Sequence, residues 1–382
     1  MILSIVIPTK NRYSCLKSIV EYASTIDSDQ FEIVIQDNSD DNQEFLNFLE
    51  KGKYSFVSYY YENTDLSVIE NSDLAVKHAR GEYISFIGDD DLFSKYLIDY
   101  VFYMKQNEIE AARFSVGGYM WPGVRSYSHK TYSLSFNKPE WRNQRENTSE
   151  SLKKVIKQGG TSLITLPRLY HGVVARTCLE KVFEKCGTFF PGPSPDMASS
   201  IALGEVISNA VLCGAPLIMS GTSKKSAGGM GKGHAHKGNI KDTPWLPKDT
   251  EEKWSADVPK IWTGETIYAE SVLKALEAMN DVNLTKQFNY SFLYAHMLVF
   301  HPDLKNLIVN TMKQGNANYV KITTYSIYII VKRVKNYVHK LWQSRFYYKK
   351  MIRENNIDNS CLAAQLVDKY LTNIMQTSMS EE

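Results

Sequence analysis

Three consecutive acidic residues, Asp89, Asp90 and Asp91, follow a short apolar run at residues 83–87. An apolar run of this length is typical of a buried strand in a parallel sheet. Adjacent carboxylates repel one another unless a cation or hydrogen-bond donors offset their charge, and ligands bind at the carboxyl ends of parallel strands. The triplet therefore predicts a divalent-metal site; the alternative is an acidic cap on a helix at residues 92–106.

Polar residues follow each of four predicted strands, at residues 2–7, 31–35, 56–61 and 83–87, and a helical pattern follows each polar group. This alternation predicts a doubly wound parallel sheet. For one strand end alone, a turn or a helix cap explains the polar residues, whereas four ends at one edge favour a binding site. The first strand lacks a glycine-rich turn, so the dinucleotide-binding fingerprint is absent.

Composition narrows the class of protein. The chain has 382 residues, 43% of them hydrophobic and 12% aromatic, which is typical of one large or two ordinary globular domains. The formal net charge of 44 − 42 = +2 gives no argument for a nucleic-acid partner. The five cysteines have neither disulfide-framework nor metal-ligand spacing. With neither a signal-peptide pattern nor an apolar run long enough to span a bilayer, we expect a cytoplasmic protein.

Three segments occur in a familiar order and spacing: SIVIPTKNR, VIQDNSDD and ARGEYISFIGDDD. Together they resemble the successive signatures of family 2 glycosyltransferases, closely over the first 90 or so residues and loosely to about residue 210. The resemblance implies an α/β fold of the GT-A type, with a Rossmann-like, mostly parallel sheet flanked by helices. Here a C-terminal helical extension would follow it.

The resemblance also implies residue roles. The acidic triplet is similar to the DxD motif, whose first acid lies near the ribose and whose last, Asp91, binds Mn²⁺ or Mg²⁺ on the donor diphosphate, with Asp89 as a second candidate metal ligand. Asp37 would bind the base, commonly uracil. Because ENSDLAVKHA departs from the commoner pattern around Asn71, the donor sugar stays open. The expected donor-binding residues are Pro8, Thr9, Arg12, Asp37, Asn63, Asn71, Asp89 and Asp90.

Asp196 is the candidate general base. It ends a proline-rich turn, PGPSPD, before a predicted helix at residues 197–203, in the part of the domain where relatives place their base. A carboxylate there would remove the acceptor hydroxyl's proton as the new bond forms, and a single base without a nucleophilic carboxylate would invert the anomeric configuration. The alternative is a helix cap. His171 either orients a substrate or is an ordinary core histidine.

From Ser220 onward the composition changes: residues 220–242 contain six glycines, five lysines and two histidines. The segment is either a flexible linker or a mobile lid whose lysines neutralise phosphate. As a lid, it would use Lys224, Lys225 and Lys232, while His234 and His236 would reach the metal. The predicted organisation is therefore a catalytic domain at 1–219 (donor half 1–92, acceptor half 93–219), a lid and bridge at 220–262, and a helical region at 263–382.

Two features concern the acceptor and partners. Trp121, in an aromatic-rich stretch at residues 113–136, is either a platform for a sugar ring or part of the core. Between Asp303 and Glu354 there are eleven Lys and Arg and no acid, and helical patterns are predicted over residues 303–313 and 319–355. Such a basic amphipathic helix either contacts an anionic membrane, packs on the catalytic domain, or pairs with a second subunit.

These observations predict an inverting, metal-dependent glycosyltransferase. The donor would be a nucleoside-diphosphate sugar, expected to be UDP-linked, and the acceptor a hydroxyl of a bacterial surface-glycan precursor, either a glycan or a lipid-linked glycan. One alternative is an inactive nucleotide-sugar-binding or scaffold protein. A nucleotidyltransferase is a second alternative, but it would need a glycine-rich, basic first loop. We expect no nucleic-acid partner, and leave open a homo-oligomer and peripheral contact with the inner face of the cytoplasmic membrane.

Overall fold

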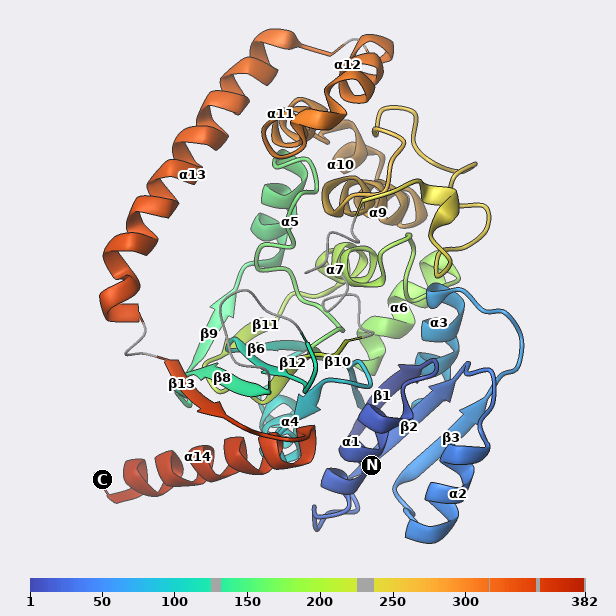
Figure 1. The fold of residues 1–382 in the computed structure, drawn as a ribbon, viewed down its shortest axis with the longest axis vertical. Helices are drawn as coiled ribbons and strands as arrows, with labels where there is room; N and C mark the ends of the chain where they lie inside the picture. The colour runs from blue at the N-terminus through green and yellow to red at the C-terminus, as the bar shows by residue number, and fades with distance from the viewer. Residues whose placement is uncertain (125–131, 225–236, 316, 348–350, 381–382) are drawn as a thin grey trace.

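The computed structural model describes residues 1–124, 132–224, 237–315, 317–347 and 351–380 (Figure 1). Its larger sheet has eight strands in the order β3-β2-β1-β4-β10-β6-β11-β9. The first four strands along the chain are mutually parallel, as the alternation of strand and helix predicts. They are β1 (Leu3–Thr9), β2 (Phe31–Asp37), β3 (Val57–Tyr61) and β4 (Tyr83–Phe86).

Beyond β4 the sheet becomes mixed. β10 (Gly172–Ala175) lies antiparallel between β4 and β6 (Ala111–Phe114). β11 (Ala210–Cys213) runs parallel to β6, and β9 (Asn143–Glu146) closes that edge in the antiparallel sense. Because β10 enters from later in the chain, it brings residues near 170 against the end of β4. The α/β class and mostly parallel sheet predicted for a GT-A fold are confirmed.

A second sheet has five strands in the order β13-β8-β7-β12-β5. These are β13 (Met351–Asn355), β8 (Ser133–Asn137), β7 (Gly117–Met120), β12 (Ile218–Thr222) and β5 (Leu92–Phe93). Two predictions fail here. Residues 92–106 do not form one helix, because β5 precedes α4 (Tyr96–Gln106). Nor do residues 319–355, because α13 (Tyr319–Tyr347) is followed by a strand that pairs with β8.

Helices flank the larger sheet and form a separate layer beside it (Figure 1). The first seven are α1 (Tyr13–Ala23), α2 (Gln43–Gly52), α3 (Val68–His78), α4, α5 (Thr148–Lys157), α6 (Arg176–Cys186) and α7 (Pro195–Val206). The layer around α7 continues with α9 (Gly264–Ala278), α10 (Val282–Lys286), α11 (Tyr290–Phe300) and α12 (Lys305–Gln314), and with two 3₁₀ turns, η1 (Ile240–Asp242) and η2 (Pro302–Leu304). α14 (Ser360–Ser380) is the last.

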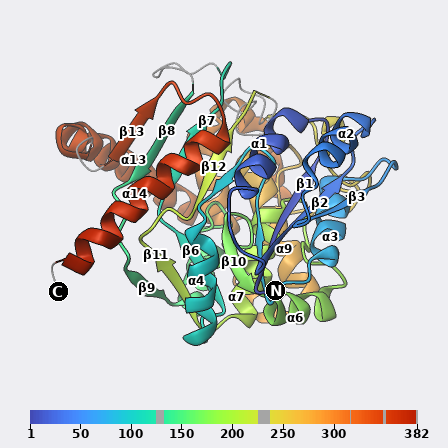
Figure 2. The ribbon, with the colours of Figure 1, turned by 90° about the horizontal axis from the view of Figure 1, so that it is seen from below.

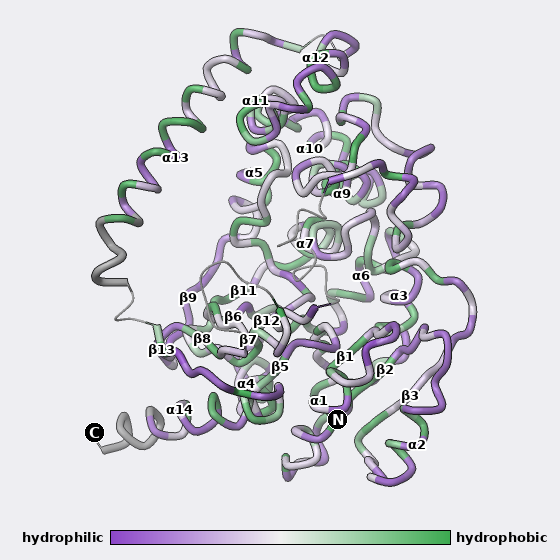
Figure 3. The backbone as a smooth tube through the Cα atoms, viewed as in Figure 1, coloured by the Kyte–Doolittle hydropathy of each residue, from purple (hydrophilic) through white to green (hydrophobic). Residues whose placement is uncertain are grey.

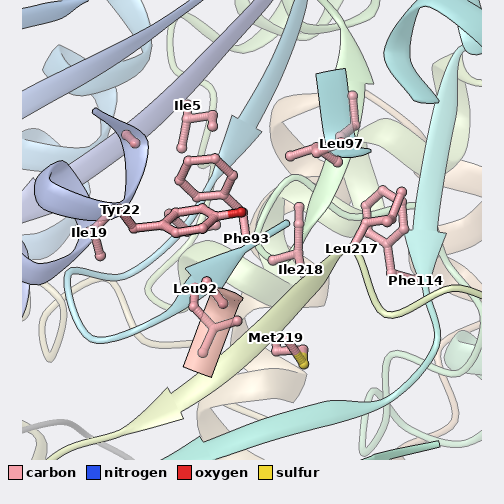
Figure 4. Packing of buried hydrophobic residues seen from close by; sticks show 14 of the residues in the cluster. Ile5, Ile19, Tyr22, Leu92, Phe93, Leu97, Phe114, Leu217, Ile218 and Met219 are labelled. Carbon is pink, nitrogen blue, oxygen red and sulfur yellow. The ribbon is translucent and has the colours of Figure 1, made fainter. Parts of the chain in front are cut away.

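α14 packs against α1 and β5, beneath the strand that follows the acidic triplet (Figure 2). Its buried Asp368 accepts hydrogen bonds from the Tyr22 hydroxyl (2.6 Å) and the Ser94 hydroxyl (2.5 Å). Tyr22 also packs edge-on against Phe93 of β5, with ring centroids 5.4 Å apart (Figure 4). The C-terminal helix therefore braces the segment directly after Asp91.

Candidate active site

The acidic triplet forms a tight turn directly after β4. Asp89, Asp90 and Asp91 are all buried, and the Asp91 N–H donates to the Gly88 carbonyl oxygen at 3.1 Å. The carboxylate of Asp91 accepts two main-chain N–H bonds of 2.6 Å, from Gly88 to Oδ2 and from Gly221 to Oδ1. Backbone donors at this turn offset part of the charge that three adjacent acids would otherwise concentrate.

Arg12 supplies the main positive charge. Its guanidinium contacts both oxygens of Asp89, at 2.6 Å (Nη2 to Oδ1) and 3.0 Å (Nε to Oδ2), and reaches Asp90 at 3.5 Å. The Thr9 hydroxyl donates to Asp89 as well, at 2.6 Å. Burial raises the pKa of Asp89 to about 7, and the charge of Arg12 opposes that rise. The predicted donor-side residues Thr9, Arg12, Asp89 and Asp90 are thus gathered in one cluster.

The end of β1 turns without a glycine because Asn11 adopts a left-handed conformation (φ 59°), which asparagine tolerates better than most residues. Asn11 is held there by the Ser39 hydroxyl, which accepts its N–H at 2.7 Å. This turn directs Arg12 back toward the acids, with the half-buried Pro8 at the end of β1. The sequence analysis noted the missing glycine but assigned no role to Asn11.

Asp37 lies at the end of β2 and is fully buried. Its Oδ2 accepts hydrogen bonds from the hydroxyls of Tyr13 (2.6 Å) and Tyr59 (2.7 Å), and its Oδ1 accepts the Ser39 N–H (2.9 Å). Both oxygens are therefore used inside the protein. Contact with a nucleotide base would require one of these donors to move, and the base-binding role of Asp37 stays a prediction.

Two asparagines predicted to face the donor differ in their surroundings. Asn71, in the second turn of α3, is buried, and its Oδ1 has no hydrogen-bond partner among the described residues. A buried amide oxygen without a partner is uncommon and suits a ligand hydroxyl or N–H. Asn63, after β3, is exposed. Both remain predicted donor-binding residues, with Asn71 the better placed for a buried contact.

β12 crosses directly over the acidic turn. Besides the Gly221 bond to Asp91, the Ser223 N–H donates to Asp90 Oδ2 at 2.9 Å. The Trp121 indole N–H donates to the Asp90 carbonyl oxygen at 2.7 Å, and the ring is only 8% exposed. The hypothesis that Trp121 is a sugar platform is wrong, because its ring faces are covered by the core. Sequence reasoning missed Gly221, whose only signal was its place at the start of the glycine-rich segment.

His171 joins the cluster from the opposite direction. It precedes β10 with a left-handed backbone (φ 58°), and its N–H donates to the Phe86 carbonyl oxygen at 3.0 Å. Its Nε2 lies 2.7 Å from Asp91 Oδ2. Burial lowers the pKa of His171, but the charge of Asp91 and their hydrogen bond raise it above its usual value. His171 is thus a partner of the acid and not an isolated core histidine.

Asp196 lies in the first turn of α7, after the N-cap residue Ser194. Its half-buried carboxylate makes no hydrogen bond with the described residues, so its side chain is not the helix cap. Burial raises the pKa of Asp196 to about 6; His171 and Arg168 act against this rise, and Asp91 adds to it. A carboxylate with a raised pKa and no fixed partner suits a general base.

The predicted lid begins at this site. Ser223 holds Asp90, and the next residue, Lys224, is exposed. Lys225, Lys232, His234 and His236 lie outside the described residues.

The described residues hold no group of three or more His, Cys, Asp or Glu arranged as a metal site. Asp91 and His171 nonetheless bring a carboxylate oxygen and an imidazole nitrogen within 2.7 Å of each other. Mg²⁺ and similar cations are commonly bound by one or two protein groups together with substrate phosphates. Asp91 and His171 would hold such a cation in place of the hydrogen bond between them. Asp89 fits a cation less well, because its carboxylate is already paired with the positive charge of Arg12.

Comparisons with known proteins agree with this description. A family model, glycosyl transferase family 2, matches residues 4–165. No curated protein sequence matches the chain. Among solved structures, S. aureus TarS 1-349 in complex with UDP-GlcNAc is 16% identical, with a TM-score of 0.52, covering 82% of this chain and 80% of that one. This likeness shows the same fold.

Two further structures are more distant. A longer S. aureus TarS structure is 14% identical with a TM-score of 0.43, covering 59% of this chain, which spans only 37% of that protein. The mannosyltransferase PcManGT from Pyrobaculum calidifontis, in complex with GDP-Man and Mn²⁺, is 12% identical with a TM-score of 0.42, covering 96% of this chain and 86% of that one. Residues 4–165 are therefore similar to glycosyl transferase family 2, and the fold of the chain is of the GT-A type.

Proposed function

We propose that the protein is an inverting, metal-dependent glycosyltransferase that moves a hexosyl or N-acetylhexosaminyl group from a UDP-linked donor to a hydroxyl of a bacterial surface-glycan precursor. The observation that supports this most is the cluster at the end of β4, where His171 contacts Asp91 and Arg12 contacts Asp90. The charges of Asp91 and His171 also act on Asp196 of α7. The UDP-GlcNAc complex of TarS makes that sugar nucleotide the first donor to test.

On the donor side, the negative charge of the donor diphosphate would have to be neutralised. Two phosphates would be repelled by the acidic turn alone, and Arg12 leaves little unpaired charge on Asp89. A divalent cation held by Asp91 and His171 would neutralise the diphosphate and stabilise the charge that develops as it leaves. In this proposal Thr9, Arg12 and the N–H groups of Gly88 and Gly221 hold the two flanking carboxylates in position.

The acceptor side would work through Asp196. Its carboxylate accepts the proton of the acceptor hydroxyl while that oxygen attacks the anomeric carbon from the face opposite the leaving diphosphate. This single displacement inverts the configuration, because no second carboxylate takes part as a nucleophile. The raised pKa of Asp196 makes it a stronger base than an ordinary aspartate, yet still ionised near neutral pH.

The test is release of UDP from UDP-GlcNAc with Mn²⁺ and a crude surface-glycan acceptor fraction, measured for the wild type and two variants. Asp91→Ala is expected to lose both turnover and metal-dependent donor binding, and Asp196→Asn to lose turnover only. Asp99→Asn is a matched control, since Asp99 is an exposed acid in the first turn of α4. Full turnover by Asp196→Asn would remove the proposed base.

A second candidate is a nucleotide-sugar-binding or scaffold protein without catalysis. The carboxylate of Asp196, which makes no hydrogen bond within the described part of the chain, favours the enzyme, because a binding protein has no need for a base with a raised pKa. UDP-GlcNAc binding without any UDP release, over a panel of donors and acceptors, would favour the scaffold.

A peripheral membrane location is also part of the proposal. Among the described residues, no helix is both long and apolar enough to cross a membrane. α13 runs along the outside of the molecule, and only part of its length packs on α11 (Figure 1). Hydrophobic and hydrophilic residues alternate along it (Figure 3). Its exposed apolar residues include Ile327, Tyr328, Ile330, Val331, Val334, Tyr337, Val338 and Leu341.

Lys332, Arg333 and Lys335 lie among these apolar residues and are exposed. Basic residues near an anionic leaflet contribute about 1 kcal/mol each, so this mixture suits an anionic lipid surface. Vesicles of phosphatidylglycerol should co-sediment the protein, and vesicles of phosphatidylcholine should not. A triple Lys332→Gln, Arg333→Gln, Lys335→Gln variant should lose that binding. Stable dimers in solution without vesicle binding would instead indicate that a second copy covers α13.

A further inference from the structure

Tyr170 and His171 lie in a tight turn, and their side chains stack on each other. The Gly172 N–H donates to the Leu169 carbonyl oxygen at 3.1 Å, which closes a four-residue turn with Tyr170 and His171 in its middle. His171 is left-handed (φ 58°), a conformation that is uncommon outside glycine. The ring centroids of Tyr170 and His171 are 3.8 Å apart, with 28° between the ring planes. The turn therefore brings an imidazole face to face with a neighbouring phenol ring.

The ring of Tyr170 is itself anchored on β4. Phe86 packs against it edge-on, with ring centroids 6.0 Å apart and 70° between the planes. The main chains of Phe86 and Tyr170 form a parallel bridge. On either side of that bridge, Phe86 donates its N–H to Leu169 at 3.3 Å and accepts the His171 N–H at 3.0 Å. Tyr170 thus offers the imidazole a fixed surface.

The hydroxyl of Tyr170 lies at the acidic turn. A Cβ atom built on Gly88 would stand 3.1 Å from Asp91 Oδ2, 3.2 Å from Asp90 Oδ1 and 3.4 Å from the Tyr170 hydroxyl oxygen. These three oxygens therefore face the same small space beside Gly88. Burial and the charges of nearby acids, Asp91 first, raise the pKa of Tyr170 well above its usual value, so the hydroxyl keeps its proton and adds no negative charge.

The two groups of the candidate cation site, Asp91 and His171, are held unequally. The Asp91 carboxylate accepts main-chain N–H bonds from Gly88 and Gly221. Within the described residues, the His171 imidazole has one hydrogen bond, to Asp91, and one ring contact, with Tyr170. A cation bound between Asp91 and His171 would replace that hydrogen bond. Of these two contacts, the stack on Tyr170 would then be the one that still orients the imidazole.

We propose that Tyr170 is a positioning residue of the candidate cation site, whose ring holds the His171 imidazole with Nε2 toward Asp91 both before and after a divalent cation binds. Groups that orient metal ligands typically contribute about ten- to a hundred-fold in metal affinity. The ring carries this role and the hydroxyl does not, because Asp91 already has its main-chain donors. The proposal rests on the proposed function, since it assigns a further residue to the same site.

A second stack of tyrosine on histidine supplies a matched control. Tyr60 of β3 stacks on His78 of α3, with ring centroids 3.6 Å apart and 4° between the planes. Tyr60 is half-buried, as Tyr170 is. Tyr170→Leu and Tyr60→Leu each remove one stack, whereas Tyr170→Phe keeps the stack at His171 and removes only the hydroxyl.

The first test needs no ligand and observes the imidazole by proton NMR of protein with isotope-labelled histidine. A hydrogen-bonded imidazole N–H exchanges slowly with water, and the signal of His171 is assigned by its absence in His171→Gln. We expect this signal in the wild type, Tyr170→Phe and Tyr60→Leu, and its loss in Tyr170→Leu. A signal in Tyr170→Leu as sharp as that of the wild type, or no signal in the wild type, would overturn the proposal.

The second test measures UDP affinity in Mn²⁺ by calorimetry. Relative to the wild type, Tyr170→Leu should lose at least about ten-fold, while Tyr170→Phe and Tyr60→Leu should stay within about three-fold. Equal losses in Tyr170→Phe and Tyr170→Leu would assign the effect to the hydroxyl. Equal losses in the two leucine variants would indicate a general loosening of the fold. Either result, or unchanged affinity in Tyr170→Leu, would overturn the proposal.

Two further outcomes have a defined meaning. If thermal unfolding shows that Tyr170→Leu does not fold, Tyr170→Phe decides: retained UDP affinity and a retained imidazole signal support the proposal, and loss of either overturns it. Failure of the wild type to bind UDP with Mn²⁺ would count against the proposed function. The imidazole signal, which is read without ligand, would still decide the role of Tyr170.

Discussion

Gly221 lies so close to Asp90 that a Cβ atom built on it would stand 1.6 Å from the Asp90 carbonyl oxygen. At this separation β12 is in direct main-chain contact with the acidic turn, and the Gly221 N–H donates to Asp91 Oδ1 at 2.6 Å. Only glycine permits that approach. The carboxylate proposed to hold the cation is therefore oriented by a residue 130 positions later in the chain.

Gly221→Ala should separate β12 from the acidic turn. The added methyl group meets main-chain atoms that cannot rotate away, so we expect a loss of about 1–3 kcal/mol of stability or a displaced strand. Asp91 would lose a donor in either case, and UDP affinity in the presence of Mn²⁺ should fall at least ten-fold by calorimetry. Gly118→Ala is the control, because a Cβ at Gly118 on β7 has its nearest neighbour at 3.4 Å. Equal UDP affinities in the two variants would contradict the prediction.

The rate of transfer should depend on the ionisation of Asp196. Its pKa is raised from 3.8 to about 6, with Asp91, His171 and Arg168 as the charged neighbours. The base form is present above that value, so kcat should rise about ten-fold per pH unit below pH 6 and level off above it. Steady-state rates between pH 4.5 and 8.5 measure this profile. A flat profile through pH 6 would argue against Asp196 as the base.

The raised pKa of Asp196 also predicts that the stability of the folded protein depends on pH. A carboxyl with a raised folded-state pKa binds its proton more tightly in the folded protein, so its contribution to stability falls as pH rises from about 4 to about 6. Asp196→Asn removes this loss of stability at higher pH, because asparagine does not ionise. Its urea midpoint at pH 8 should equal or exceed that of the wild type while turnover is abolished. A strongly destabilised variant would indicate a structural role.

Asp368 should stabilise the whole domain through α14. Its carboxylate accepts from the hydroxyls of Tyr22 and Ser94 and lies 3.3 Å from the Lys95 N–H. Asp368→Ala leaves these buried donors without an acceptor, which costs about 1–3 kcal/mol. Urea unfolding at pH 7 measures the change. Asp358→Ala, at an exposed acid just before α14, should change stability by less than about 0.5 kcal/mol.

The first half of the fold follows from local sequence pattern. β1, β2 and β4 are short apolar runs that are buried and followed by polar residues, and β3 is a half-buried edge strand rich in tyrosine. These patterns allowed their positions and parallel direction to be predicted. The cluster of Thr9, Arg12 and the acids could also be predicted, because parallel strands end at a common edge.

The rest depends on contacts between distant segments. The antiparallel insertion of β10 brings His171 to Asp91, and nothing in the pattern around residue 171 indicates that pairing. Residues 351–355 continue a helical pattern but form β13, because β8 offers an open strand edge that the local pattern does not reveal. The burial of Trp121 also depends on segments distant in sequence, β12 and the acidic turn, so the local pattern could not reveal it.

The account depends most on one claim, that the acidic turn holds a diphosphate through a divalent cation bound by Asp91. Calorimetric titration of UDP in Mn²⁺ and in EDTA, for the wild type and Asp91→Asn, tests it directly, with Asp65→Asn as an exposed acid near the same sheet edge. We predict tight UDP binding that is lost in EDTA and lost in Asp91→Asn, and retained in Asp65→Asn. Equal UDP affinity under all of these conditions would contradict the account.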